Sequence, residues 1–180
     1  MEETFREFRD IKIVLIGEER VGKTNIISRM MDNQFEYSYK STINPTINEK
    51  RMVLKNYSYS FRVNIWDTSG QERFRSLNKI FLGGASIALI VFNITDRKTY
   101  EGINYWIQEM KNSEVSLVCL VANYCELDEA YAVSIKELKR LGDENHFQIY
   151  MISAKNNIGI QEMLKDIITK YADYNFDSYY

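Results

Sequence analysis

Gly17-Glu18-Glu19-Arg20-Val21-Gly22-Lys23-Thr24 is the stretch that decides the fold, because it has the spacing Gly-x4-Gly-Lys-Thr. The apolar run Ile11–Ile16 comes directly before it, and residues with helical periodicity follow over Lys23–Met31. A glycine-rich turn between a strand and a helix points successive backbone N–H groups at one spot, beside the positive end of the helix. The stretch therefore predicts a loop that binds phosphate groups.

Lys23 and Thr24 end this motif and have defined chemistry. The lysine supplies positive charge to the β- and γ-phosphates of a nucleotide, and the threonine hydroxyl suits Mg²⁺, a hard cation that prefers oxygen ligands. Thr24 is therefore a candidate metal ligand. The residues that we expect around the phosphates are Glu19, Arg20, Val21, Gly22, Lys23, Thr24 and Asn25.

Length and composition indicate one globular domain. A chain of 180 residues with 45% hydrophobic and 27% charged residues buries roughly two-thirds of its surface in a single core. A net charge of −2 gives no basic excess, so we expect no nucleic-acid partner. No apolar run approaches the roughly 20 residues that span a bilayer, and a cytoplasmic protein is expected. Cys119 and Cys125 are interpreted as reduced thiols, and His146 as a structural residue.

Apolar runs alternate with segments of helical period along the chain. We predict strands over Ile11–Ile16, Met52–Leu54, Phe61–Trp66, Ile87–Phe92, Val115–Val121 and Phe147–Ile152. We predict helices over Lys23–Met31, Gln71–Phe81, Thr99–Met110, Val133–Leu141 and Ile160–Tyr171. Continuously apolar strands are typical of a parallel sheet that helices cover on both faces. The polar stretch Lys55–Ser60 predicts a hairpin that adds one antiparallel edge strand, and the class is α/β, doubly wound.

A second stretch, Trp66-Asp67-Thr68-Ser69-Gly70-Gln71-Glu72-Arg73-Phe74-Arg75, closely resembles the second switch of Rab proteins, a branch of the Ras superfamily of small GTPases. The resemblance implies the P-loop NTPase fold, with six strands, one of them antiparallel, and five helices on both faces. It places the GTPase domain at residues 10–172, between an N-terminal extension, 1–9, and a tail, 173–180. In the family, residues matching Asp67, Gly70 and Gln71 hold Mg²⁺ through water, sense the γ-phosphate and orient the attacking water.

The first switch has two candidate threonines. Tyr39-Lys40-Ser41-Thr42-Ile43 resembles the Rab version, in which the threonine binds Mg²⁺ in the triphosphate state, and Thr42 follows Thr24 at the family spacing. Asn44-Pro45-Thr46-Ile47 resembles the version in Ras itself, so Thr46 is the alternative. We favour Thr42.

Three further positions match an effector-binding patch of Rab proteins, namely Ile47, Trp66 and Phe81, with an isoleucine in place of one aromatic residue. Ordinary core packing is the alternative interpretation. Phe35 matches an aromatic residue that lies edge-on against the guanine base, and a plain core or surface aromatic is the alternative there.

The base-recognition motifs of the family are also present, in altered form. Asn123-Tyr124-Cys125-Glu126 resembles Asn-Lys-x-Asp, and Ser153-Ala154-Lys155 resembles the last guanine motif, in which a backbone N–H contacts the base oxygen. Glu126 provides the carboxylate that accepts hydrogen bonds from guanine N1–H and the amino group, which adenine lacks. Its extra methylene predicts weaker binding of guanine, while Tyr124 is expected to stack on the base.

The resemblance implies a GTP/GDP switch that takes part in vesicle traffic. Effectors, exchange factors and GTPase-activating proteins are the expected partners. Glu19 brings negative charge and bulk to the γ-phosphate, which predicts slow, poorly stimulated hydrolysis unless Arg20 neutralises it. The alternative function is a degenerate, non-hydrolysing scaffold with the same fold. No cysteine follows Cys125, so we expect membrane contact only through an anchor that this chain does not contain.

Overall fold

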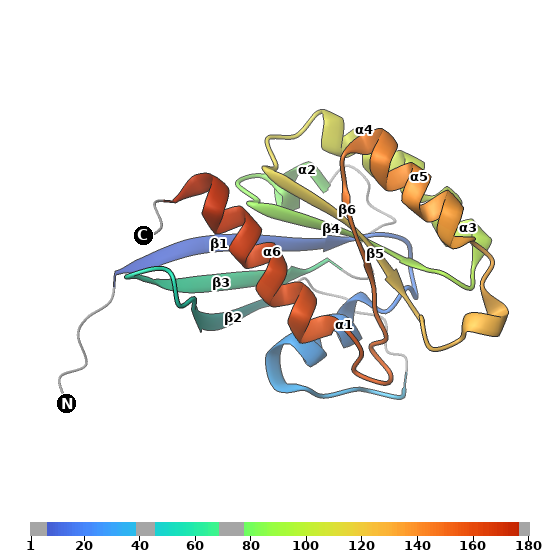
Figure 1. Ribbon diagram of the computed structural model, residues 1–180, viewed down its shortest axis with the longest axis horizontal. Coiled ribbons are helices and arrows are strands. Elements are labelled where there is room, and N and C mark those ends of the chain that lie inside the picture. Colours follow the sequence, from blue (N-terminus) through green and yellow to red (C-terminus); the bar gives the residue numbers. More distant parts are fainter. Residues whose placement is uncertain (1–6, 39–45, 69–77, 177–180) are drawn as a thin grey trace.

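A six-stranded sheet forms the centre of the computed structural model, which describes residues 7–38, 46–68 and 78–176 (Figure 1). The strand order is β2-β3-β1-β4-β5-β6. The strands are β1 (Phe8–Ile16), β2 (Thr46–Val53), β3 (Ser60–Asp67), β4 (Ile87–Asn93), β5 (Leu117–Asn123) and β6 (Gln148–Met151). All neighbouring pairs are parallel except β2 and β3, which confirms the predicted mostly parallel α/β sheet with one antiparallel strand.

The antiparallel edge strand is longer than the sequence indicated. β2 begins at Thr46, where the apolar pattern suggested Met52, and it pairs with β3 from Thr46 opposite Asp67 to Val53 opposite Ser60. As an edge strand, β2 has exposed or half-buried residues throughout, so it lacks the apolar run that marks a buried strand. β5, in contrast, begins two residues later than predicted, at Leu117 instead of Val115.

Seven helical segments surround the sheet in the described part of the chain. They are α1 (Lys23–Asp32), α2 (Asn78–Leu82), α3 (Arg97–Glu101), α4 (Ile103–Lys111), the 3₁₀ turn η2 (Asp128–Ala130), α5 (Ile135–Asn145) and α6 (Ile160–Asn175). The helix predicted over Thr99–Met110 is divided at Gly102 into α3 and α4. Of the helix predicted over Gln71–Phe81, the part before Asn78 lies outside the described residues.

The start of α5 also differs from the prediction, for a local reason. Ser134 is the N-cap, and its side chain and that of Glu137 form a reciprocal capping box, so the helix begins at Ile135 instead of Val133. Arg97 donates to the Glu137 carboxylate at 2.7 Å and holds its pKa at about 2, with help from Ser134. This pair connects α3 and α5 on the surface.

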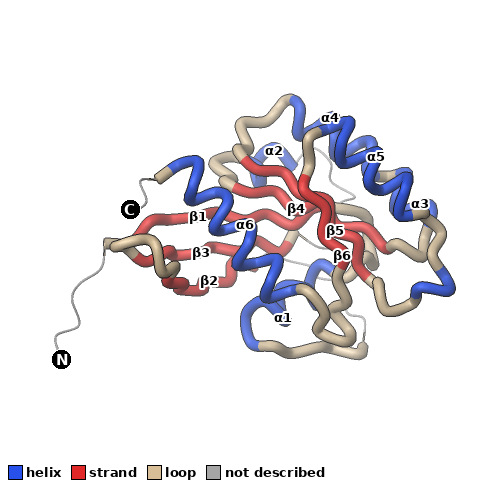
Figure 2. Tube along the Cα trace, viewed as in Figure 1, coloured by secondary structure: helices blue, strands red, loops and turns tan. Residues whose placement is uncertain are grey.

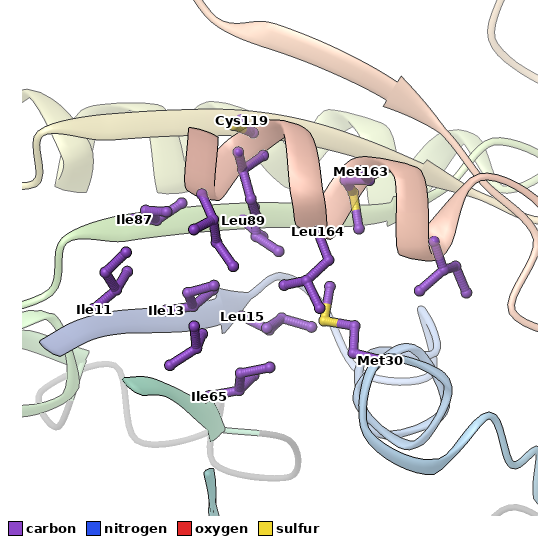
Figure 3. Close-up of a cluster of buried hydrophobic side chains, with 14 of the residues drawn as sticks. Ile11, Ile13, Leu15, Met30, Ile65, Ile87, Leu89, Cys119, Met163 and Leu164 are labelled. Atoms are coloured by element: carbon purple, nitrogen blue, oxygen red, sulfur yellow. The ribbon is translucent and has the colours of Figure 1, made fainter. Parts of the chain in front are cut away.

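Helices cover both faces of the sheet, as the doubly wound class requires (Figure 2). α1 and α6 pack on one face, where side chains of alternate strand positions such as Ile13, Leu15 and Leu89 meet Met30 and Leu164 (Figure 3). The intervening strand positions face α2, α4 and α5 in a second cluster. The sheet is therefore buried on both sides, and the loops at the carboxyl ends of its five parallel strands come together at one edge.

Candidate functional site

The predicted phosphate loop connects β1 to α1 and requires glycine at two positions. Gly17 has a φ of 142°, and a Cβ there would lie 2.1 Å from the Val91 carbonyl oxygen. Gly22 has a φ of 94°, and a Cβ there would lie 2.4 Å from Nδ2 of Asn123. Both positive φ values and both close approaches exclude side chains. The loop therefore packs directly against the ends of β4 and β5.

Lys23 begins α1, and its charged end is buried in this loop. Its side chain is only 3% exposed, and Nζ donates to the carbonyl oxygens of Gly17 and Glu18, both at 2.8 Å. A buried ammonium group is costly without acceptors or anions around it. Its position places one positive charge where the motif expects the β- and γ-phosphates. Glu19 is half-buried, and Arg20 is exposed with a φ of 64°.

Oxygen groups that suit Mg²⁺ lie on both sides of the loop. Thr24 is exposed in the first turn of α1, and Asp67, which is 2% exposed, ends β3 beside Leu15 of β1. Thr68 fixes this end of β3, because its hydroxyl donates to the Leu15 carbonyl oxygen at 2.6 Å. A hydroxyl and a carboxylate fit the hard-cation preference of Mg²⁺. Thr24 and Asp67 are thus the described residues that would hold the ion.

Three predicted residues of the switches, Thr42, Gly70 and Gln71, lie outside the residues that the structure describes. Thr46 is described, and it is the exposed first residue of β2, opposite Asp67 in the antiparallel register.

A small pocket of about 130 Å³ lies beside the phosphate loop, where the sequence places the base. Its lining residues are Gly22, Asn25, Phe35, Asn123, Tyr124, Glu126, Leu127, Ala154 and Lys155. The two motifs predicted to recognise guanine therefore meet at one pocket. Leu127 also lines the pocket, although it was not predicted from the sequence as a site residue.

Asn123 joins the walls of this pocket. Its Nδ2 donates to the Val21 carbonyl oxygen at 3.0 Å, and its Oδ1 accepts from the Ala154 backbone N–H at 3.1 Å. The side chain is 2% exposed, so both bonds are shielded from water. One amide therefore holds the phosphate loop and the last guanine motif in a fixed relative position. The Ala154 N–H, which belongs to the motif that the resemblance places at the base oxygen, donates to Asn123 in this structure.

Tyr124 takes the place of the family lysine and has an uncharged side chain here. Burial, with a smaller contribution from Glu126, raises the pKa of its phenol above the ordinary value. Its hydroxyl lies 3.4 Å from the Arg20 carbonyl oxygen, at the long end of the hydrogen-bond range. The residue has a φ of 69°, which a non-glycine residue rarely adopts. The ring thus reaches from the base pocket to the phosphate loop.

Glu126 has a buried oxygen, Oε2, that finds no hydrogen-bond partner among the described residues. Buried polar atoms are nearly always paired, and an exception needs an explanation. Because Glu126 lines the pocket, two N–H donors of a guanine base would satisfy this carboxylate. The unpaired oxygen is consistent with the predicted role.

The last guanine motif follows β6 in a tight turn. Ser153 is fully buried and pairs with Ile158 across an isolated antiparallel bridge, and its hydroxyl accepts from the Asn156 N–H at 2.9 Å. Ala154 is buried, whereas Lys155 is exposed at the pocket rim. Ala154 and Lys155 thus bring this turn to the wall of the pocket.

Phe35 and Asn25 form the wall contributed by α1 and the segment after it. Phe35 packs against the core and also lines the pocket. Asn25 donates to the Glu36 carbonyl oxygen at 3.1 Å and accepts from the Glu36 N–H at 3.0 Å. Asn25 therefore holds the segment that carries Phe35 close to the first turn of α1.

The three residues predicted as an effector patch do lie together, but they differ in exposure. Ile47 is 56% exposed and sits opposite Trp66 in the β2–β3 register, and the Trp66 and Phe81 rings are 6.3 Å apart. Phe81 is only 8% exposed, which is typical of a residue in the core. Lys12 places its ammonium 4.2 Å from the centre of the Trp66 ring and donates to the Gly83 carbonyl oxygen.

None of the described helices combines the length and the apolar character that crossing a bilayer would need. The fold and the loop geometry together define an α/β domain built to bind a nucleotide. Comparison with known proteins gives the family. The Ras family model matches residues 12–173. The chain therefore belongs to the Ras family.

Individual relatives identify the branch. The chain is 35% identical to Ras-related protein RABA5e of Arabidopsis thaliana, over 91% of this chain and 75% of the relative. It is 31% identical to Ras-related protein Rab-31 of Rattus norvegicus, over 88% of this chain and 82% of the relative. It is 33% identical to GTP-binding protein ypt3 of Schizosaccharomyces pombe, over 88% and 74%. The chain is a Rab-like small GTPase.

Proposed function

We propose that this GTPase is a GTP/GDP switch of the Rab type, which regulates vesicle traffic by binding effectors in its GTP-bound form. The observation that carries the proposal is the pair of hydrogen bonds made by Asn123, because they bring a phosphate loop and a base pocket into one site. The traffic role and the cytoplasmic, endomembrane setting are supported by the Rab names of the relatives.

In this proposal each part of the site has a defined task. Lys23 and the loop N–H groups bind the phosphates. Thr24 and Thr42 would hold Mg²⁺, with Asp67 holding it through water, and the bound ion would supply positive charge beside the phosphate oxygens. Gly70 senses the γ-phosphate, and Gln71 orients the attacking water. Their family motif supports these roles.

The base is held by the residues around the pocket. Glu126 accepts from guanine N1–H and its amino group, Tyr124 covers one face, and Phe35 lies against its edge. The Ser153-Ala154-Lys155 turn faces the base oxygen. The support is that all these residues except Ser153 line one pocket beside Gly22.

Hydrolysis is proposed to be slow because of Glu19. Its carboxylate adds negative charge beside a phosphate that already carries it, and its size occupies space that an arginine finger from a partner would need. The half-buried position of Glu19 in the phosphate loop supports the prediction of slow hydrolysis.

Effector binding is proposed to use Ile47 and Trp66, with Phe81 beneath them. Their contact across β2 and β3 supports one continuous patch. The patch is tested by comparing Ile47→Asp with Val53→Asp, an exposed residue at the other end of β2, for capture of cytosolic proteins by GTP-loaded and GDP-loaded chain. A nucleotide-dependent set of partners lost only with Ile47→Asp is expected. Equal capture by both variants would contradict the patch.

A non-hydrolysing scaffold is the second candidate function, and the altered base motif favours it. Tyr124 and Glu126 replace a lysine and an aspartate of the base motif, and Glu19 and Arg20 are unusual residues in the phosphate loop. Single-turnover hydrolysis of bound GTP with Mg²⁺ separates the two candidates. Conversion to GDP over hours supports the switch, whereas GTP that stays intact while bound supports the scaffold.

A further inference from the structure

Arg29 makes several side-chain contacts beside the base pocket, although it belongs to none of the nucleotide motifs. It lies on α1, and its Nε donates to the Ala154 carbonyl oxygen at 2.8 Å. Nη2 donates to the Lys155 carbonyl oxygen at 2.9 Å, and Nη1 donates to the Asn33 carbonyl oxygen at 2.7 Å. One guanidinium group therefore ties the base-recognition turn to the end of α1.

These three bonds need the geometry of arginine. A guanidinium group is planar and offers several N–H donors in a fixed fork, whereas a lysine ammonium is a single point. Ala154 is consequently held from two directions, because Asn123 accepts from its N–H while Arg29 donates to its carbonyl oxygen. Asn123 connects this turn to the phosphate loop, and Arg29 connects it to α1.

Arg29 also supports the aromatic wall of the pocket. Its guanidinium carbon lies 5.6 Å from the centre of the Phe35 ring, within the range of a cation–π contact. Phe35, Ala154 and Lys155 line the pocket, but Arg29 does not. Any effect of Arg29 on a bound base must therefore pass through these three residues.

We propose that Arg29 is a positioning residue for the guanine base, which fixes the Ala154–Lys155 turn and Phe35 relative to each other and so sets how long a nucleotide stays bound. The inference rests on the proposed function, because it takes the pocket to hold guanine. Its position on the same helix as Lys23 and Thr24 means that the base turn and the phosphate-binding end of α1 share one rigid element.

The test measures release of a fluorescent GDP analogue from the full chain, using Arg29→Lys, Arg29→Gln and the control Arg140→Gln. Arg140 is an exposed arginine on α5, paired only loosely with Glu144 at 3.6 Å. We expect release to become about tenfold to a hundredfold faster in both Arg29 variants, because both substitutions remove hydrogen bonds that the charged guanidinium group donates to the turn. The control should release GDP at the unmodified rate.

A pair of base analogues separates positioning from general loosening. The 6-thioguanosine diphosphate changes only the acceptor that the Ala154–Lys155 turn faces, whereas inosine diphosphate lacks only the amino group that Glu126 faces. In the Arg29 variants the preference for GDP over the thio analogue should shrink, while the preference over inosine diphosphate should persist. Unchanged release, or equal loss of both preferences, would overturn the role of Arg29. Absence of GDP binding by the unmodified chain would instead contradict the proposed function.

Discussion

The Asn123 side chain donates a hydrogen bond to the Val21 carbonyl oxygen 3.0 Å away, although 102 residues separate the two along the chain. Replacement by alanine would leave that carbonyl and the Ala154 N–H buried and unpaired. We expect Asn123→Ala to lower the free energy of unfolding by about 2–4 kcal/mol, since each such group costs about 1–3 kcal/mol. Urea unfolding measures this loss.

Asn104→Ala is the matched control, because Asn104 is exposed on α4. This change should leave stability nearly unaltered and slightly favour the helix. GDP binding should weaken in Asn123→Ala and persist in Asn104→Ala. Equal free energies of unfolding for the two variants would show that the Asn123 hydrogen bonds do not stabilise the fold.

Glu126→Asp should tighten GDP binding. The shorter side chain restores the family residue and moves the carboxylate oxygens by about an ångström, a change that can alter binding about a hundredfold. Competition of GDP against a fluorescent analogue measures the affinity, with Glu129→Asp, an exposed neighbour on η2, as the control. Weaker binding by Glu126→Asp would mean that the pocket has adapted to the longer acid.

Glu19→Gly should accelerate GTP hydrolysis. Removal of one carboxylate near the γ-phosphate is expected to raise the single-turnover rate about tenfold, equivalent to about 1.4 kcal/mol of barrier. Glu114→Gly, which removes an exposed glutamate from the loop before β5, should leave the rate unaltered. A rate that does not respond to Glu19→Gly would show that this side chain does not act on the phosphate.

Thiol reagents should react slowly with the folded protein. Burial raises the pKa of Cys119 to about 12, and burial also raises the pKa of Cys125, so little reactive thiolate exists near pH 8. Both thiols should react rapidly in denaturant. Rapid labelling of the folded chain would contradict the burial of these thiols.

The raised pKa of Cys119 also predicts how stability depends on pH. The ordinary pKa of a cysteine thiol is about 9, and the folded state holds the Cys119 proton more tightly than the unfolded state does. The contribution of Cys119 to the free energy of unfolding is therefore fully present below about pH 9 and decreases as the pH rises further.

Local motifs made the phosphate loop predictable, because Gly17, Gly22 and Lys23 act through backbone geometry that a short stretch determines. The sheet class was likewise predictable from continuous apolar strands. The start of β2 was not, since an exposed edge strand carries polar residues on both faces. The break at Gly102 was also missed, because the apolar spacing continues across it.

Arg29 could not be found from the sequence. Its acceptors Ala154 and Lys155 are 125 and 126 residues away, and an arginine in a helix is ordinarily a solvated residue. The unpaired oxygen of Glu126 was equally hidden, because burial depends on how β5 and β6 end beside each other. Contacts between distant segments, rather than motifs, determine these features.

Isothermal titration of the full chain with GDP and with ADP, both with Mg²⁺, tests most directly whether this pocket recognises guanine. GDP should bind with a measurable heat, and ADP should bind at least about a hundredfold more weakly, because Glu126 would face a base without its two donors. Equal affinity for the two nucleotides, or no binding of GDP, would contradict a guanine-specific site.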